Sequence, residues 1–421
     1  MIDINFIREN PSLVQKKAKE KNADVNIDHI LEIDRKYREL SAGVQKLREE
    51  RNLLTSGMKG KPTSEQIGKG KILKEKLEKQ EYALKALEEE RKVWLLKIPN
   101  LAIDDVPVGD ASKNQIIKTV GAPKVFSKEG FTPKDHLEIG ENLDIIDMER
   151  AAKISGTRFA YLKNDGVLLE FALKQLAFDI LLEEGFIPII PPVLIKKEIM
   201  DGLGYTQMGE DENIFSLDKD NFYLVGTSEQ SIVPMFRDET LAIKELPKRF
   251  VGFSTCFRRE AGSYGKDTKG IFRVHQFDKV EMVSFAKAGD SDKEHKYLLS
   301  LEEKFFQLLE IPYQVVQMST GELGFPAARK YDIEAWIPSQ NKYREITSTS
   351  TTTDFQSRRL NIKYQDGNEK KYVHILNGTA FSMNRPIIAI LENYQQKDGS
   401  VLIPKILQRY LNSEKISPKN I

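Results

Sequence analysis

The chain has 421 residues, more than one ordinary hydrophobic core organises, so its length predicts two domains or one large domain with an appendage. With 40% hydrophobic residues, 30% charged residues and a net charge of +1, the composition is typical of a soluble globular protein and identifies no partner by itself. The single cysteine, Cys256, excludes an internal disulfide framework and a cysteine-rich zinc site, and we expect no zinc.

The N-terminal sequence MIDINFIREN carries acidic residues where a signal peptide needs a basic and then an apolar segment. The most apolar stretch, GFIPIIPPVLI (185–195), is short and interrupted by prolines, so it lacks the length of a membrane span. We therefore expect a cytoplasmic protein that has no membrane partner.

Two segments with coiled-coil spacing follow, separated by a polar turn. Apolar residues recur at alternating steps of three and four over 30–54 and again over 73–98, where Arg91 occupies one position of the seam. Between the two segments, TSGMKGKPTSEQ (55–66) contains two glycines and a proline that break a helix. The pattern predicts an antiparallel helical hairpin whose arms are roughly 40 Å long at 1.5 Å per residue.

Such a hairpin could be a dimerisation device or spacer, or it could contact a large partner. Residues 1–98 contain 22 Lys and Arg against 17 Asp and Glu, an excess of +5 where the whole chain has +1. This asymmetry favours a phosphate backbone as the partner.

Residues 99–120 contain prolines and a glycine and are typical of a linker. Beyond them, segments rich in β-branched residues alternate with polar turns, and two segments have helical spacing. The predicted strands are FYLVGTSE, RFVGFSTCFRRE, GIFRVHQFDKVEMVSF, KYREITSTSTT and KYVHILNGTAF, and the predicted helices are VLLEFALKQLAFDILLEEG and 294–310. Successive strands with few helices between them predict an α+β fold, in which helices pack on a mostly antiparallel sheet.

The segment FRREAGSYGKDTKGIFRVHQFDKVE (257–281) concentrates cations, acids and aromatic residues. Because residues two apart on a strand share a face, two strands joined by the loop AGSYGKDTKG would present these side chains together. The first strand contributes Arg258 and Glu260, and the second contributes Arg273, His275, Phe277 and Glu281. The set suits a nucleotide, and the alternative is a salt-bridged solvent-exposed face, on which Phe277 would be poorly placed.

The common phosphate-binding loops are missing. GLGYTQMG lacks the third glycine of a dinucleotide-binding loop, and AGSYGKD lacks the Ser or Thr of a P-loop. Bound ATP would therefore need side chains and a divalent ion, for which Glu345 and Ser348 offer oxygen ligands. Arg385 precedes Pro386 at a predicted helix start, where an anion is favoured. Each of these residues taken alone also fits an ordinary surface position.

Together these segments resemble the class II aminoacyl-tRNA synthetases. Residues 257–281 resemble motif two, GFIPIIPPVLI resembles motif one with its dimer-interface proline at Pro191 or Pro192, and NGTAFSMNR resembles motif three. MIDINFIRENP, the coiled hairpin, LVGTSEQ, EAGSYGKDTKG, RVHQF, EITSTSTTTDFQSRR and LENYQ are similar, in order, to the seryl-tRNA synthetases. The resemblance implies a tRNA-binding coiled-coil arm (1–108) and a class II catalytic domain with an antiparallel sheet (109–421).

The resemblance also implies roles for matching residues. Arg258 and Arg385 would be the catalytic residues, on the α-phosphate with the serine carboxylate and on the γ-phosphate respectively. Glu345 and Ser348 would coordinate Mg²⁺, and Phe277 would stack on adenine. The remaining implied ATP-site residues are Arg259, Glu260, Val274, Ile346 and Thr347, and the implied serine-site residues are Thr227, Ser228, Glu229, Glu281 and Thr379.

The implied activity is ATP-dependent formation of seryl-adenylate from L-serine, followed by transfer of the seryl group to tRNA(Ser). The resemblance also implies a homodimer, and tRNA(Sec) is left open as a second acceptor. The alternative is a ligase on the same fold that loads a carrier protein, although relatives of that kind lack the arm. A non-enzymatic coiled-coil protein would not need the four residues Arg258, Phe277, Glu281 and Arg385 together. Ser228 and Thr347 depart from the commonest family pattern of Ala and Ser, which bears on specificity rather than on the reaction.

Overall fold

The computed structural model describes residues 1–56, 63–261 and 269–418. The chain divides into two compact units, Met1–Leu101 and Ala102–Ile421, a division N-terminal to the one predicted between 108 and 109. The helix-breaking glycines and proline predicted within 55–66, and most of the predicted loop AGSYGKDTKG, lie outside the described residues. No helix in the described part is both long enough and apolar enough to cross a membrane.

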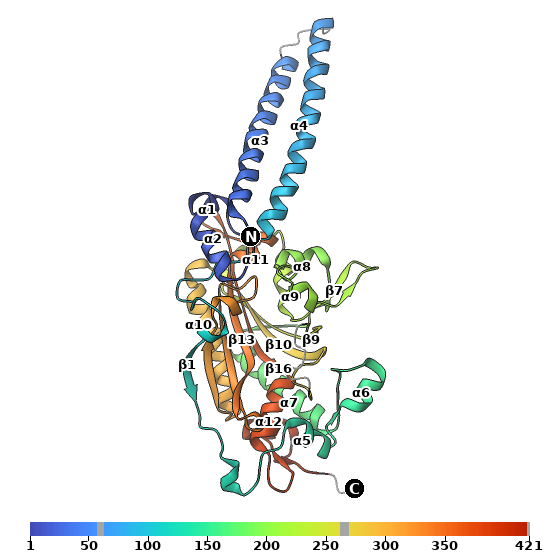
Figure 1. Ribbon diagram of the computed structural model, residues 1–421, viewed down its shortest axis with the longest axis vertical. Helices are drawn as coiled ribbons and strands as arrows, with labels where there is room; N and C mark the ends of the chain where they lie inside the picture. Colours follow the sequence, from blue (N-terminus) through green and yellow to red (C-terminus); the bar gives the residue numbers. More distant parts are fainter. Residues whose placement is uncertain (57–62, 262–268, 419–421) are drawn as a thin grey trace. The chain divides into compact units, whose positions relative to one another are not determined.

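In its described residues the first unit has four helices, two of which form the predicted hairpin (Figure 1). These helices are α1 (Ile4–Glu9), α2 (Pro11–Glu20), α3 (Ile27–Ser56) and α4 (Ser64–Leu96). The α3 and α4 helices pack along each other through Val44, Leu47 and Leu77, which are buried. Thr63 begins α4 with a capping box, in which its hydroxyl accepts from Gln66 N and the Gln66 side chain accepts from Thr63 N.

A buried carboxylate joins α1, α3 and α4. Asp34 is fully buried and pairs with Arg8 at 2.8 Å, with Arg91 at 3.1 Å and with Arg38 at 3.2 Å. Burial raises the pKa of the Asp34 carboxyl, but Arg8, Arg91 and Arg38 outweigh burial and hold its pKa below the usual value. The cation at the predicted seam position Arg91 is thus paired, and its guanidinium carbon lies 4.4 Å from the ring centroid of Tyr37.

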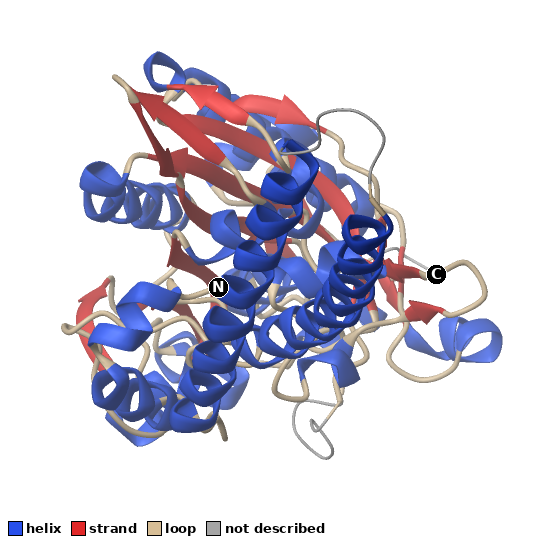
Figure 2. Cartoon of the chain, turned by 90° about the horizontal axis from the view of Figure 1, so that it is seen from above, coloured by secondary structure: helices blue, strands red, loops and turns tan. Residues whose placement is uncertain are grey.

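The second unit is built on an eight-stranded sheet in the order β1-β11-β12-β13-β16-β10-β9-β4. Strands are drawn in red in Figure 2. The strands of this sheet are β1 (Gln115–Val120), β4 (Ile187–Ile189), β9 (Lys248–Phe257), β10 (Gln276–Ala286), β11 (Tyr313–Gln317), β12 (Arg329–Ile337), β13 (Lys342–Thr353) and β16 (His374–Ser382). Neighbouring strands are antiparallel except for the β4–β9 pair, so the predicted sheet type is confirmed.

Helices and short strands complete this unit. The helices are α5 (His136–Asn142), α6 (Met148–Ser155), α7 (Asp165–Glu183), α8 (Lys197–Leu203), α9 (Glu229–Ile232), α10 (Ser291–Leu308), α11 (Phe355–Leu360), α12 (Asn384–Tyr394) and α13 (Lys405–Leu411). The short strands are β2 (Ile146–Asp147), β3 (Tyr161–Leu162), β5 (Leu194–Lys196), β6 (Ser216–Leu217), β7 (Phe222–Leu224), β8 (Thr240–Ala242), β14 (Lys363–Asp366), β15 (Glu369–Tyr372), β17 (Val401–Leu402) and β18 (Lys415–Ile416). Both predicted helices are present, as α7 and α10.

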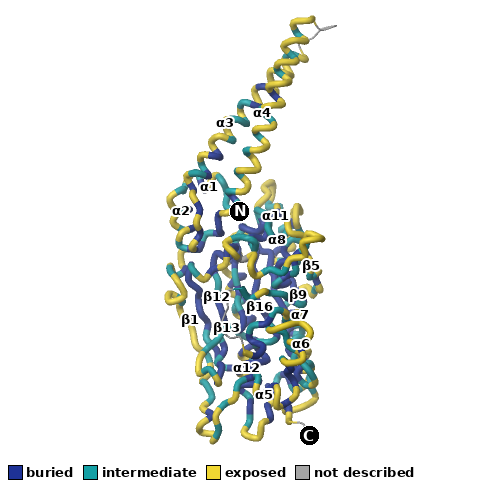
Figure 3. Tube along the Cα trace, turned by 45° about the vertical axis from the view of Figure 1, so that its right-hand side comes forward, coloured by how far each residue is buried: buried dark blue, intermediate teal, exposed yellow. Residues whose placement is uncertain are grey.

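The two faces of β10 have different roles. Val280 and Met282 point into the main hydrophobic core, to which α7, α10 and α12 also contribute. Phe277, Lys279 and Glu281 alternate with them and line cavities on the opposite face. In Figure 3 the central strands are mostly buried, whereas exposed residues predominate along α3 and α4. The cavity-lining face of β10 continues at Val283 and Phe285 into a second hydrophobic core, so the polar site lies beside packed residues on that face of the sheet.

Candidate active site

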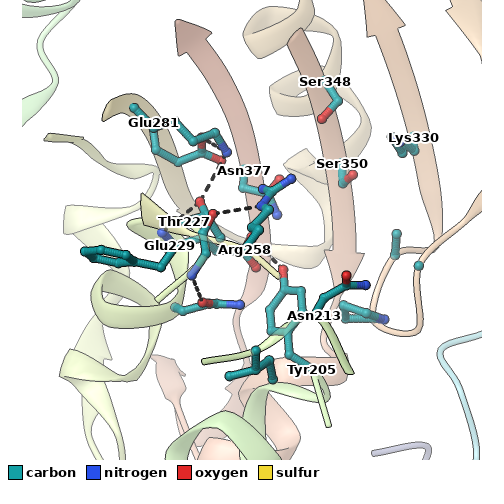
Figure 4. A pocket seen from close by; sticks show the side chains of 18 of the residues that line it. Tyr205, Asn213, Thr227, Glu229, Arg258, Glu281, Lys330, Ser348, Ser350 and Asn377 are labelled. Carbon is teal, nitrogen blue, oxygen red and sulfur yellow. Dashed lines mark hydrogen bonds and ion pairs between the residues drawn. The ribbon is translucent and has the colours of Figure 1, made fainter. Parts of the chain in front are cut away.

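A cavity of about 510 Å³ is lined by residues of β9, β10, β12, β13 and β16 and by neighbouring segments (Figure 4). A smaller cavity of about 50 Å³ shares six lining residues with it, so the two form one continuous site. The larger cavity contains the predicted residues Thr227, Glu229, Arg258, Glu260, Glu281, Glu345, Ser348 and Arg385 in its lining. The smaller cavity adds the predicted residues Val274, Phe277, Ile346, Thr347 and Thr379.

Two arginines and one carboxylate define the part of the site between the cavities. The Nε of Arg258 donates to the carbonyl oxygen of Gly226 at 3.2 Å, and its guanidinium carbon lies 5.4 Å from the centroid of the Phe277 ring. Arg385 lies 3.2 Å from a carboxylate oxygen of Glu345. Burial raises the pKa of Glu345, but Arg385, Lys330 and Arg258 outweigh burial and bring its pKa to about 2. Glu345 is therefore ionised at neutral pH.

The strands β9 and β10 pair with each other as predicted but are shorter than predicted. Because β9 ends at Phe257 and β10 begins at Gln276, the expectation that the flanking residues alternate as in a strand is wrong. Glu260 has a left-handed backbone with φ of 52°, and its carboxylate accepts from Arg273 at 2.8 Å. The ion pair, rather than strand geometry, brings both side chains to the cavity wall. The ring of His275 instead packs against aromatic residues outside the cavity lining.

The opposite end of the cavity is a buried polar network. Lys279 lies 2.5 Å from a carboxylate oxygen of Glu281 and donates to the Thr227 hydroxyl at 3.2 Å. Glu281 is directly opposite Thr379 in the pairing of β10 with β16, and both are almost completely buried. This end can therefore offer a carboxylate and hydroxyl groups to a small polar ligand.

Glu229 lies beside this network at the start of α9. The Tyr205 hydroxyl donates to one of its carboxylate oxygens at 2.8 Å, and the Gln356 amide donates to the other at 2.9 Å. Burial raises the pKa of Glu229 above its usual value, and the nearby Glu281 adds to this effect, although Gln356 opposes it. Both oxygens are thus held in place by neighbours, which fixes the carboxyl group at the cavity wall.

Known proteins share this sequence and fold over the whole chain. Residues 1–102 match the seryl-tRNA synthetase N-terminal domain, and residues 213–394 match the tRNA synthetase class II core domain (G, H, P, S and T). Serine–tRNA ligases of Acidothermus cellulolyticus and Dictyoglomus thermophilum are 45% and 46% identical to this chain, with all of each chain covered. The chain belongs to the seryl-tRNA synthetase family. The crystal structure of the seryl-tRNA synthetase from Pyrococcus horikoshii complexed with ATP has a TM-score of 0.92 at 39% identity, and the match covers 99% of this chain and all of that one.

Ser228 and Arg259 received binding roles from the resemblance, but both lie outside the lining of the two cavities. Ser228 is fully buried, and its hydroxyl hydrogen-bonds to the Ser254 hydroxyl at 2.8 Å. The Arg259 guanidinium carbon lies 5.2 Å from the ring centroid of Phe215, and its backbone N–H donates to Asn213 O at 2.9 Å. Their binding roles stay predictions. The full burial of Ser228 favours a small side chain at this position.

The site also contains residues that received no role from the sequence. Lys279 lies between Phe277 and Glu281 in the same strand alternation, so the pattern that selected its neighbours could have found it. Lys330 lies on β12, a strand that was not predicted. Tyr205 reaches the cavity from outside the large sheet, through a contact that no local sequence pattern reveals.

The predicted magnesium ligands fit the preferences of that ion. Mg²⁺ prefers carboxylate and hydroxyl oxygens and is commonly held by one or two protein groups together with substrate phosphates. Glu345 supplies an ionised carboxylate and Ser348 a hydroxyl, and both line the two cavities. Two protein oxygens fill only part of an octahedral shell, so ATP would have to supply further ligands.

Proposed function

We propose that this protein is a serine–tRNA ligase, which joins L-serine to ATP to form seryl-adenylate and transfers the seryl group to tRNA(Ser). The observation that carries the proposal is the continuous cavity in which Arg258, Glu345 and Arg385 adjoin the buried Glu281 network. One end offers groups for a nucleotide and the other offers groups for a small hydroxy amino acid. Membership of the seryl-tRNA synthetase family supports the same activity.

In the first step, the serine carboxylate would attack the α-phosphate of ATP in line and pyrophosphate would leave, so no side-chain nucleophile is needed. Arg258 would hold the attacking carboxylate and the α-phosphate together, and Arg385 would bind the γ-phosphate. Arg258 already has its Nε fixed by Gly226 O, which orients the guanidinium before substrate arrives. Catalysis would thus consist of positioning and charge stabilisation.

The nucleotide would occupy the smaller cavity. Phe277 offers an aromatic face for adenine, while Val274 and Ile346 add apolar and backbone surface. Glu345 and Ser348 would hold Mg²⁺, which supplies charge neutralisation for the phosphates when bound. Glu260, which is paired with Arg273, would lie near the adenine.

Recognition of serine would depend on the buried network. The Glu281 carboxylate would accept from the ammonium and hydroxyl groups of serine, and Thr379 opposite it would close on the hydroxyl. Thr227 and the fixed carboxyl of Glu229 would complete the surroundings of the ammonium group. Because these groups are buried, a ligand that lacks the hydroxyl would leave them unpaired.

In the second step, the terminal ribose of tRNA would accept the seryl group. The basic excess of residues 1–98 and their match to the family's N-terminal domain support the hairpin as the tRNA-binding element. The same arm argues against the alternative ligase that loads a carrier protein. We leave tRNA(Sec) as a second acceptor to be tested, and we expect the reaction to take place in the cytoplasm.

A homodimer is part of the proposal. Ile190 is 83% exposed beside β4, and Phe171 on α7 and Ile187 on β4 are also largely exposed. Apolar side chains gathered in this way are typical of a surface that a second copy covers. The molar mass in solution, measured by light scattering, would test this assembly.

The activity is tested by ATP–pyrophosphate exchange with each amino acid in turn, followed by charging of purified tRNA(Ser) and tRNA(Sec). We expect exchange with serine and charging of tRNA(Ser). Exchange without tRNA charging, accompanied by loading of a carrier protein, would favour the alternative ligase. A protein that exchanges with no amino acid would contradict the proposal.

A further inference from the structure

One wall of the larger cavity is not explained by the residues considered so far. Lys330 on β12 lines this wall beside Ser348 and Ser350 of β13 (Figure 4). In the pairing of these strands, Lys330 is opposite Ser350 and Asp332 is opposite Ser348. The ammonium group therefore belongs to the same part of the site as the predicted magnesium ligands.

Lys330 forms an ion pair at the cavity wall. Its Nζ lies 3.2 Å from Asp332 Oδ1, and the two side chains are 22% and 3% exposed. Asp332 thus supplies one carboxylate to an ammonium group that has three N–H donors. Burial lowers the pKa of Lys330, but the carboxylates of Asp332 and Glu345 outweigh burial and raise it, so the group is charged at neutral pH.

The surrounding charges favour an anionic ligand at this wall. Lys330 and Arg385 both line the larger cavity, and Arg385 lies 3.2 Å from a carboxylate oxygen of Glu345 in the same lining. Ser348 and Ser350 add hydroxyl groups. Two cations with neighbouring hydroxyls complement a phosphate group, whereas the ammonium group of serine is better matched by Glu281 at the other end.

We propose that Lys330 is a further phosphate-binding residue of this site, and that its ammonium holds a phosphate group during the reaction. The inference rests on the proposed function. Because Lys330 lines the same cavity as Arg385 and Ser348, the polyphosphate of ATP and the pyrophosphate that it releases are the favoured ligands. The terminal phosphodiester of tRNA presents the same chemistry and is the second source that the experiment distinguishes.

The test compares Lys330→Met and Lys330→Arg with the wild type. The matched control is Lys342→Met, an exposed lysine on β13 that lies outside the cavity lining. Because Lys330→Met leaves the buried Asp332 without its cation, the double variant Lys330→Met/Asp332→Asn removes both charges and guards against misfolding. Binding of ATP and of pyrophosphate is measured by calorimetry, and transfer from preformed seryl-adenylate to tRNA is measured in a single turnover.

We expect Lys330→Met and the double variant to bind pyrophosphate and ATP about tenfold or more weakly, the loss of one charge-assisted contact. Lys330→Arg should retain most of the affinity, and Lys342→Met should equal the wild type. Normal phosphate binding combined with slow transfer would assign the held phosphate to tRNA. Wild-type binding and transfer in either folded Lys330→Met variant would overturn the proposal. Failure of the proposed function would instead appear in the wild type as absent serine-dependent exchange, while calorimetry with pyrophosphate still tests Lys330.

Discussion

The hairpin and the large sheet both carry many charged side chains, but those of the hairpin are mostly exposed and those around the cavity are buried or half-buried. Along α3 and α4 only a narrow row of residues is buried, with Val44, Leu47 and Leu77 at its centre, and the charged residues around it are exposed. In the second unit, strands and a helix that are distant in sequence bring Glu281, Glu229 and other charged groups together in buried positions. A surface of exposed charges can bind a large anion, but it cannot hold a small ligand away from water.

The difference shows where chemistry can be located. Buried polar groups need partners, and a sheet supplies them from several strands at fixed distances. An isolated helical pair has only one seam, so it can bury few such groups, and Asp34 with its three arginines lies at one end of that seam. Binding of a macromolecule and catalysis are therefore expected to separate by unit, and four experiments test this separation.

The largest effect is expected when residues 28–98 are replaced by a short linker. Adenylate formation should continue, because all the residues that line the cavities lie in the second unit. Charging of tRNA should fall about a thousandfold or more, since the basic contacts to the phosphate backbone are lost. Exchange and charging are measured on the same preparation. Charging at normal efficiency would mean that the hairpin is a spacer.

Arg258→Ala should affect the other unit alone. We expect serine-dependent exchange to fall about a hundredfold or more, the usual loss for one charge-stabilising donor. Arg259→Ala is the comparison, because its guanidinium packs on Phe215 rather than lining the cavity, and a much smaller loss is expected. Circular dichroism confirms folding. If both variants lost the same exchange activity, a place in the cavity lining would not determine which of the two arginines takes part in the reaction.

Asp34→Asn should weaken the first unit while the second stays active. Removal of the buried charge leaves its arginines unpaired and should cost about 3 kcal/mol of the free energy of unfolding. Because the folded-state pKa of Asp34 is lowered, its contribution is present above about pH 4 and is lost as the pH falls further, a loss that the variant should lack. Fluorescence of Trp94 in a Trp336→Phe background reports on this unit, since the chain has 2 tryptophans. Unchanged melting would show that Asp34 contributes nothing net.

Thr379→Val is expected to have the smallest effect, confined to selectivity. It preserves volume but removes one hydroxyl partner beside Glu281, so serine should lose about tenfold in exchange while alanine changes little. Wild-type enzyme should use threonine poorly, because its extra methyl group must be excluded sterically, and alanine more poorly still. The three amino acids are compared in both proteins. If the serine-to-alanine ratio is unchanged, Thr379 does not contact the substrate.

The sequence predicted those parts of the molecule that depend on local periodicity. The seam of the hairpin and the alternation of Phe277 and Glu281 on β10 both follow from a repeat along one segment. The positions of Glu260, just after β9, and Arg273, just before β10, were not predicted from the sequence. The left-handed backbone at Glu260 and its ion pair with Arg273 depend on tertiary contacts. The roles that the resemblance supplied for Ser228 and Arg259 stay predictions, and in the structure both side chains pack outside the cavity lining.

The internal ion pairs of the site have a consequence for how it responds to salt. Glu345 with Arg385, Glu281 with Lys279 and Glu260 with Arg273 already neutralise one another before any substrate enters. A substrate would exchange partners with these pairs instead of releasing mobile ions from solution. Ionic strength should then change ATP affinity far less than it changes attachment of tRNA to the solvent-facing lysines of the hairpin. An increase in salt concentration would thus release the tRNA while the formation of seryl-adenylate from serine and ATP continues.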